Sequence, residues 1–146
     1  MSIFATLQAI AASLTPANQA ELRSRRTRER SLSHYAILSQ LPYQDAPVWD
    51  VIIPALGHVH PKERPIGAAL AATGYPESRM NRMLAASGHS LVEQIGSVIR
   101  WLISHDETSV DLTTLAEWAL SDWQRDSAKL KAVRDRVGLD FVRAAK

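Results

Sequence analysis

Residues 65–84 constrain the fold of this chain more than any other segment. They contain a run of small residues from Gly67 to Ala72, which ends at Gly74 and is followed by a second run with helical spacing. Small side chains let a helix approach a neighbouring helix closely. Glycine tolerates the left-handed conformation that closes a helix. The segment therefore predicts two short helices, over residues 65–73 and 76–87, the second closed by Gly88, in a fold in which helices pack on helices.

The rest of the chain has the same helical character. Leu91, Ile95, Val98 and Leu102 fall on one face of a segment over residues 90–104, which predicts a central core helix. No segment alternates polar and apolar residues as a half-buried strand does. We therefore predict an all-α fold with no β-sheet, built as a compact bundle or bundles of about seven to eight helices.

Capping residues and prolines mark the ends of the other predicted helices. Thr15 caps a helix that has Pro16 at its first position and continues into the arginines near residue 23. Pro42 ends a helix over residues 33–41. We also predict a helix that follows Asp45, starts at residue 46 or 47 and ends near 56, one over 112–123 capped by Asp111, and a last one over 124–145.

Length and composition place limits on the class of protein. A chain of 146 residues is typical of one domain, and we predict one helical domain over residues 1–146, with two sub-bundles divided near residues 57–64 as the alternative. The absence of cysteine excludes disulfides, thiolate metal sites and cysteine nucleophiles. The sequence has no run of about 18 apolar residues and no basic leader at its N-terminus. These features favour a soluble cytoplasmic protein with no membrane partner.

The charges of the chain are small in sum but unevenly placed. The net charge is +2, and the 17 basic residues comprise 13 arginines and 4 lysines. Arginine binds phosphate groups through two parallel hydrogen bonds, which lysine cannot do. Residues 106–122 hold five acids and no basic residue, whereas residues 125–146 hold seven basic residues and three acids. This asymmetry predicts basic faces beside an acidic one.

The densest basic segment covers residues 21–30. Its arginines are Arg23, Arg25, Arg26, Arg28 and Arg30. Five guanidinium groups in a continuing helix are a candidate site for a phosphate backbone, bound through salt-sensitive and largely sequence-independent contacts. The alternative is a solvated helix end at which Glu21 and Glu29 act as counterions.

Two further basic patches have helical spacing. Arg79 and Arg82 are three residues apart and flank the apolar side of the predicted helix over 76–87. Lys129, Arg136 and Arg143 follow one flank of the last predicted helix. Each patch alone is more typical of a solvated flank, but three patches in one small domain together favour nucleic-acid binding.

We find no catalytic or metal-binding constellation in the sequence. The five histidines include His58 and His60 in one loop, but no cysteine or nearby carboxylate completes a metal site. The run of small residues that begins at Gly67 lacks the lysine and the glycine spacing of a phosphate-binding loop. The four tryptophans have helical spacing and are predicted to be core residues, with Trp101 and Trp123 as candidates for stacking on bases. We therefore predict no enzyme activity, no cofactor and no metal.

The order of these motifs resembles the small subunit of the type I-E CRISPR surveillance complex, the CasB family of Cascade. The resemblance covers most of the chain. It rests on the basic segment from Leu22 to Arg26, the Ile66-Gly67-x-Ala69-Leu70-Ala71-x-x-Gly74 signature with Glu77-x-Arg79 and Met83-Leu84 after it, and the Asp, Leu-Ala and Trp pattern of residues 110–123.

The resemblance implies an all-helical, non-catalytic subunit. It implies as partners the other Cascade subunits with their guide RNA, a second copy of the chain, and target DNA, whose displaced non-target strand the subunit would hold so that the R-loop stays open. The basic roles would fall on Arg23, Arg26, Arg79 and Arg82, and charge geometry alone adds the other residues of the three patches. Two other classes stay open: a helical protein–protein assembly module without a nucleic-acid role, and a small helical enzyme that uses His58, His60 or His105.

Overall fold

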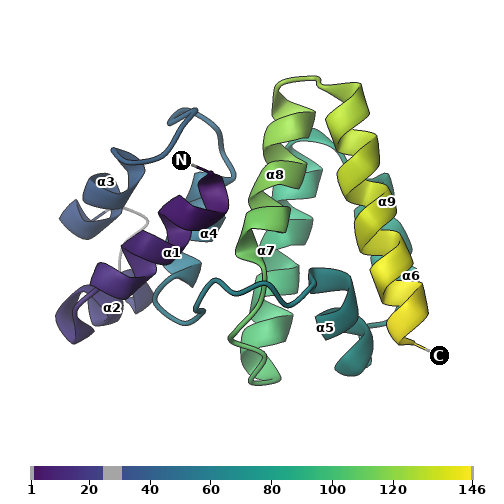
Figure 1. The fold of residues 1–146 in the computed structure, drawn as a ribbon, viewed down its shortest axis with the longest axis horizontal. Helices are drawn as coiled ribbons and strands as arrows, with labels where there is room; N and C mark the ends of the chain where they lie inside the picture. The colour runs from purple at the N-terminus through teal and green to yellow at the C-terminus, as the bar shows by residue number, and fades with distance from the viewer. Residues whose placement is uncertain (1, 25–30, 146) are drawn as a thin grey trace.

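The computed structural model of the chain describes residues 2–24 and 31–145, which form nine helices and no strand (Figure 1). The helices are α1 (Ile3–Ser13), α2 (Pro16–Arg23), α3 (Leu32–Leu38), α4 (Trp49–Ala55), α5 (Ile66–Ala72), α6 (Glu77–Ala85), α7 (Gly88–Ser104), α8 (Leu112–Trp123) and α9 (Ser127–Ala144). The predicted all-α class is confirmed for these residues, although the helices outnumber the predicted seven to eight. The prediction of one domain, with its alternative of two sub-bundles, stays a prediction.

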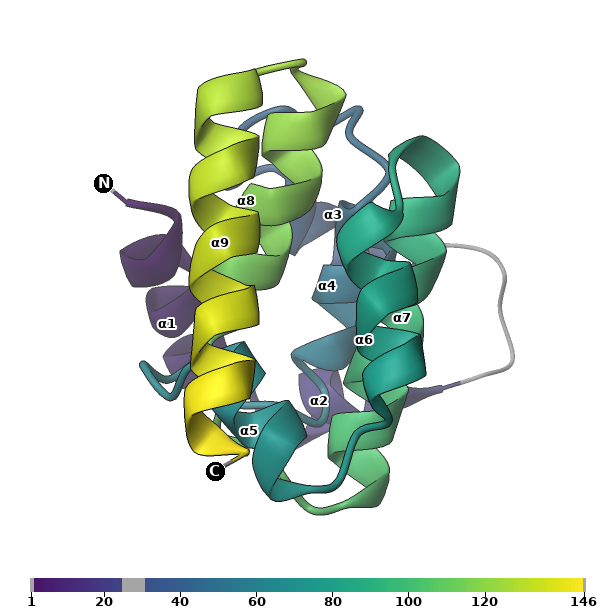
Figure 2. The same cartoon turned by 90° about the vertical axis from the view of Figure 1, so that its right-hand side faces the viewer.

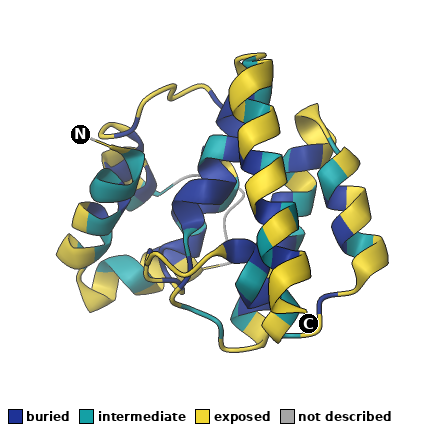
Figure 3. Ribbon diagram, turned by 45° about the vertical axis from the view of Figure 1, so that its right-hand side comes forward, coloured by how far each residue is buried: buried dark blue, intermediate teal, exposed yellow. Residues whose placement is uncertain are grey.

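The helices are arranged around α7 and α8, which pack against each other (Figure 1). Helices α1 to α4 gather on one side of this pair, and α5, α6 and α9 lie on the other. Buried residues line the inward sides of the helices and exposed residues the outer sides (Figure 3). Two fully buried tryptophans, Trp49 on α4 and Trp118 on α8, are the largest side chains of the core. The predicted core role of these two residues is confirmed.

Several predicted helix starts are confirmed by their caps. The Thr15 side chain accepts a hydrogen bond from the backbone N–H of Asn18, whose own side chain accepts one from the Thr15 N–H, with Pro16 at the first helical position. Asp111 accepts hydrogen bonds from both the backbone and the hydroxyl of Thr114 at the start of α8. Such caps satisfy backbone donors that the first turn of a helix leaves free.

The start of α4 differs from the prediction. Asp45 does not cap the helix, which begins at Trp49 and has no side-chain cap. The residues before it form turns that bring the carbonyl oxygens of Pro42 and Tyr43 to 3.0 and 3.1 Å from the indole Nε1 of Trp49. The two oxygens give the buried Trp49 indole N–H its hydrogen-bond acceptors. The Trp49 indole N–H therefore has its acceptors in the turns that replace the predicted first turn of this helix.

Three other predicted boundaries are wrong. The third helix ends at Leu38 and not at residue 41, and α9 starts at Ser127 because Asp126 caps it and Arg125, with φ +58°, turns the chain before it. Gly88, with φ +56°, begins α7, whereas α6 ends earlier, at Ala85. Arg125 and Gly88 have φ values outside the helical region, and each lies at one of these boundaries.

Helix α5 packs closely against α9 at Gly67. A Cβ atom added at Gly67 would lie 2.4 Å from the backbone oxygen of Val137 and 2.8 Å from the backbone nitrogen of Phe141. The predicted role of the small residues in close helix packing is therefore confirmed. Gly74 follows with φ +75°, which confirms that it ends this helix in the left-handed conformation. Together these two glycines fix where α6 begins.

Candidate nucleic-acid interface

An open groove of about 540 Å³ lies between α2, α4 and α7. Arg23, at the end of α2, and Arg100, on α7, both line it, and both side chains are exposed. Val51 and Ile99 contribute apolar surface to its floor. Within residues 2–24 and 31–145, neither arginine makes an ion pair. The groove therefore brings together two guanidinium groups from distant parts of the chain.

Local packing positions each of these two arginines. The backbone of Gly57 approaches α2 so closely that a Cβ atom there would lie 2.9 Å from Cγ of Arg23. Arg100 donates a hydrogen bond from Nη2 to the hydroxyl of Ser97, one turn earlier on α7, at 3.1 Å. Arg23 is contacted along its aliphatic stem, and Arg100 uses one nitrogen of its guanidinium group. The other guanidinium donors of both residues are available to an anion.

Sequence reasoning missed Arg100, although the sequence carries a signal for it. The apolar stripe of α7 predicts a core helix, and its residues Leu91, Ile95, Val98 and Leu102 are buried. A helix with such a stripe presents its opposite side outward. Arg100 is the one arginine of α7, which contains no lysine, and this isolated cation opposite the apolar stripe is the signal for it.

Arg79 lies against an aromatic cluster on the adjoining side of α7. Its Cζ atom lies 5.0 Å from the ring centre of Tyr75 and 5.4 Å from that of Trp101. The Trp101 indole donates a hydrogen bond to the Thr73 hydroxyl at 2.9 Å, and the His105 ring stacks on Trp101 with centroids 4.1 Å apart. Both rings lie within cation–π distance of the Arg79 guanidinium, which keeps its N–H donors for other partners.

Arg82 lies one turn further along α6 and is exposed. It makes no ion pair with any other residue that the structure describes. Met80 and Met83 are buried and turn the opposite side of α6 inward, and α6 runs alongside α7 (Figure 2). Arg79 and Arg82 thus lie one turn apart on α6, as their spacing predicts. Arg79 contacts aromatic rings, and no such contact is seen for Arg82 in the described chain.

The groove and the aromatic cluster lie on neighbouring sides of one helix. Arg100 and Trp101 are consecutive residues of α7, and a helix with its side chains is about 10–12 Å across. Arg23 lines the groove with Arg100, and Arg79 lies against Trp101, the next residue of α7. We call the surface formed by Arg23, Arg79, Arg82 and Arg100 the α7 face.

The other predicted binding residues lie elsewhere. Lys129 and Arg136 line a separate pocket with Glu117, and Arg143 is exposed near the end of α9. Glu117 and Arg136 form an ion pair of 3.7 Å. The structure thus places the C-terminal basic residues apart from the α7 face. The predicted residues Arg25, Arg26, Arg28 and Arg30 lie outside the described residues, as does Glu29.

The candidate counterion Glu21 has a partner on α3. Its carboxylate accepts a hydrogen bond of 2.7 Å from the hydroxyl of Ser33 on α3. This hydrogen bond is the main reason why the pKa of Glu21 is lower than usual. Glu21 therefore links α2 to α3 and stays ionised near neutral pH.

Two described histidines pair with carboxylates, His34 with Asp50 and His89 with Glu93. No group of three or more His, Asp or Glu side chains in residues 2–24 and 31–145 is placed to hold a metal ion. His58 lines the groove, whereas His105 stacks on Trp101. Trp123 is exposed and meets Tyr43 edge to face. None of the described helices is long and apolar enough to cross a membrane.

The chain was compared with protein-family models, with curated proteins and with solved structures. None of the three comparisons found a match.

Proposed function

We propose that this chain is a non-catalytic subunit that holds a single nucleic-acid strand on its α7 face, within a CRISPR surveillance complex of the Cascade type. The supporting observation is the placement of Arg23 and Arg100 in one open groove with no ion pair in the described part of the chain. Arg79, which lies against Trp101 of α7, and Arg82, on the same helix α6, are the two further cations of the α7 face. The type of complex is proposed from the resemblance to the CasB family. The mode of binding is proposed from the arginines of the α7 face.

The physical basis of the proposal is charge acting on a balanced reaction. Opening target DNA against a guide RNA exchanges one duplex for another of similar stability, so a few backbone contacts to the displaced strand shift the equilibrium. Contacts to phosphates release counterions and need no particular sequence. Weak contacts suffice within a complex, because tethering raises the local concentration of the strand.

A protein–protein assembly module is the second candidate function. Leu139 and Val142 lie three residues apart on α9 and are 49% and 56% exposed. Apolar side chains in such a position favour contact with another protein. This surface is separate from the α7 face, so one chain can have both roles.

The binding role is tested with Arg23→Glu/Arg100→Glu and a short single-stranded DNA, by fluorescence anisotropy over a series of salt concentrations. We expect at least about tenfold weaker binding, because charged hydrogen bonds contribute about 1.5–3 kcal/mol each. The slope of log affinity against log salt should also fall by roughly 1.4, since two phosphate contacts are lost.

The matched control is Lys62→Glu/Lys131→Glu, which makes the same change in net charge at two exposed lysines away from the α7 face. Equal weakening by both double variants would show that net charge alone governs binding and would refute the role of the α7 face. Membership of the complex is tested by co-expression with the other Cascade subunits and a guide RNA. Stable incorporation with unchanged R-loop stability in Arg23→Glu/Arg100→Glu would favour the assembly module.

A further inference from the structure

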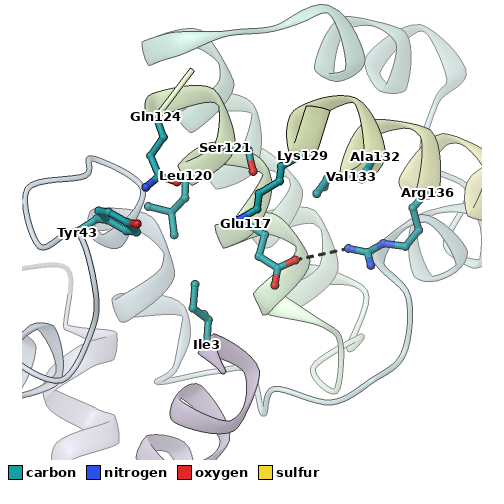
Figure 4. Close-up of a pocket in the computed structure, with 10 residues that line it drawn as sticks. All are labelled: Ile3, Tyr43, Glu117, Leu120, Ser121, Gln124, Lys129, Ala132, Val133 and Arg136. Carbon is teal, nitrogen blue, oxygen red and sulfur yellow. Dashed lines mark ion pairs between the residues drawn. The ribbon is translucent and has the colours of Figure 1, made fainter. Parts of the chain in front are cut away.

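A second concave site lies away from the α7 face. It is a pocket of about 370 Å³ formed by the start of α1, the loop before α4, and helices α8 and α9 (Figure 4). This volume lies within the range of small-molecule sites in proteins, about 300–1,000 Å³. The pocket joins residues from the beginning, middle and end of the described chain.

The two ends of the pocket differ in chemistry. Tyr43 and Gln124 lie side by side at one end, beside Leu120, and Arg136 lies at the other, with Lys129 projecting between them (Figure 4). Val133 is buried and adds apolar surface to the wall. The pocket thus offers an aromatic and apolar end with an amide, and a basic end.

Ser121 has an unused hydrogen-bonding group in this pocket. The residue is 4% exposed and lines the pocket, and its hydroxyl makes no hydrogen bond within residues 2–24 and 31–145. Because Ser121 lines the pocket and its hydroxyl has no partner in the described chain, that hydroxyl is available to a polar ligand atom.

Tyr43 is held at the pocket in an unusual backbone conformation. Its φ of +52° is rare for a bulky residue, and its carbonyl oxygen accepts the indole N–H of Trp49 at 3.1 Å. Its ring meets the ring of Trp123 edge to face, with centroids 6.1 Å apart. Strained backbone of this kind gathers at ligand sites, where the surrounding structure maintains it.

The basic end has one cation free of internal pairing. Arg136 forms its ion pair with Glu117, whereas Lys129 makes none with any described residue. Lys129 and Arg136 are seven residues apart on α9 and therefore share one side of the helix. The rim of the pocket carries a net positive charge, which suits an anionic group on the ligand.

We propose that this pocket binds one nucleotide, with its base between Tyr43 and Leu120 and its phosphate at Lys129. The planar base suits the aromatic and apolar end, and the Gln124 amide can both donate to and accept from a base edge. The Ser121 hydroxyl supplies a further polar contact. A free mononucleotide and a single unit of a strand share this chemistry. The proposal does not rest on the α7 face, which involves other residues.

The test uses isothermal titration calorimetry of the full chain with deoxyadenosine monophosphate, deoxyadenosine and inorganic phosphate. We expect the monophosphate to bind more tightly than either part, and Lys129→Ala to weaken its binding about tenfold, the loss of one charged contact. Lys131→Ala is the matched control, because Lys131 is an exposed lysine on α9 that pairs with Asp135 and does not line the pocket. It should leave binding unchanged.

A site-specific readout comes from NMR, in which the side-chain amide signal of Gln124 should shift on addition of the monophosphate. The same titration with a short single-stranded oligo-dA distinguishes the two sources. A Lys129-dependent shift with the monophosphate indicates a site for free nucleotides, and one seen with oligo-dA alone indicates a site for a strand unit. Both results support the pocket.

The proposal is overturned if neither probe shifts the Gln124 signal in a manner that depends on Lys129, or if inorganic phosphate binds as tightly as the monophosphate. The same measurement distinguishes failure of the proposed strand binding at the α7 face from failure of the proposed nucleotide binding in the pocket. Arg23→Glu/Arg100→Glu should leave monophosphate binding intact, whereas Lys129→Ala should reduce it.

Discussion

Helices α5 and α6 are neighbours in the chain, joined through Gly74, but they are held in the fold by different means. Helix α5 contains no charged residue and buries Gly67 directly against the backbone of α9. Helix α6 carries charge on its outer side and contacts its surroundings through Met80 and Met83. The comparison shows how a fold can fix one helix rigidly while it presents the next one to a partner.

The two contacts should differ in their tolerance of change. At Gly67 backbone meets backbone, and neither side can move aside without shifting a whole helix. Under α6 the contact is made by methionines, whose flexible side chains fill irregular gaps and adapt to substitution. We expect substitutions in α5 to affect folding and substitutions on the outer side of α6 to affect binding.

The largest predicted effect is that of Gly67→Ala. We expect a loss of about 3 kcal/mol in the free energy of unfolding, because the added methyl would overlap backbone atoms of α9. Urea unfolding followed by circular dichroism measures it. Gly138→Ala on α9 is the control, since its nearest contact would be the flexible Leu84 side chain at 4.0 Å, and this change should stabilise the protein by about 0.5–1 kcal/mol. Similar values for both variants would contradict the close contact.

The junction between the two helices should show a smaller effect. Gly74→Ala is expected to cost about 1–2 kcal/mol, because φ of +75° is unfavourable for a residue with a Cβ atom, although nothing lies within 4 Å of that atom. Urea unfolding again measures the change. Gly74→Asn should cost less, since asparagine tolerates this conformation better. Equal costs for alanine and asparagine would point to a cause other than backbone conformation.

The smallest predicted stability effects distinguish the two arginines of α6. Arg79→Ala should cost about 0.5–1 kcal/mol through loss of its contacts with the Tyr75 and Trp101 rings. Arg82→Ala should change stability by less than about 0.5 kcal/mol. Thermal unfolding compares the two variants, and anisotropy should show weaker binding of single-stranded DNA by both. A larger stability loss for Arg82→Ala would reverse the assignment of the two roles.

Much of the fold was predictable from local sequence. The apolar stripe of α7, the caps at Thr15 and Asp111, and the small residues of α5 each act through nearby residues or through one helix face, which a sequence displays directly. The start of α4 was not predictable in this way. There the Trp49 indole donates hydrogen bonds to two carbonyl oxygens, and only the folded chain brings these groups together.

The candidate site was less predictable than the fold. The sequence singled out Arg23, Arg79 and Arg82 as members of separate patches, and spacing along one helix gave no information on how α2 and α6 meet α7. Arg100 was not predicted as a binding residue, because it is an isolated arginine in a helix whose apolar stripe predicts a core role. Lys129 and Arg136 were predicted on one flank, but the pocket they share with Tyr43 depends on packing between distant segments.

The contact of Gly67 with α9 also has a consequence for synthesis of the protein. Gly67 and Val137 are about 70 positions apart in the chain. Ribosomes add roughly 5–20 residues per second, so α5 must wait several seconds for the helix that covers it. During that interval its apolar surface is open to chaperones or to other nascent chains. A change that slows translation between α5 and α9 should therefore lower the yield of native protein without altering its final stability.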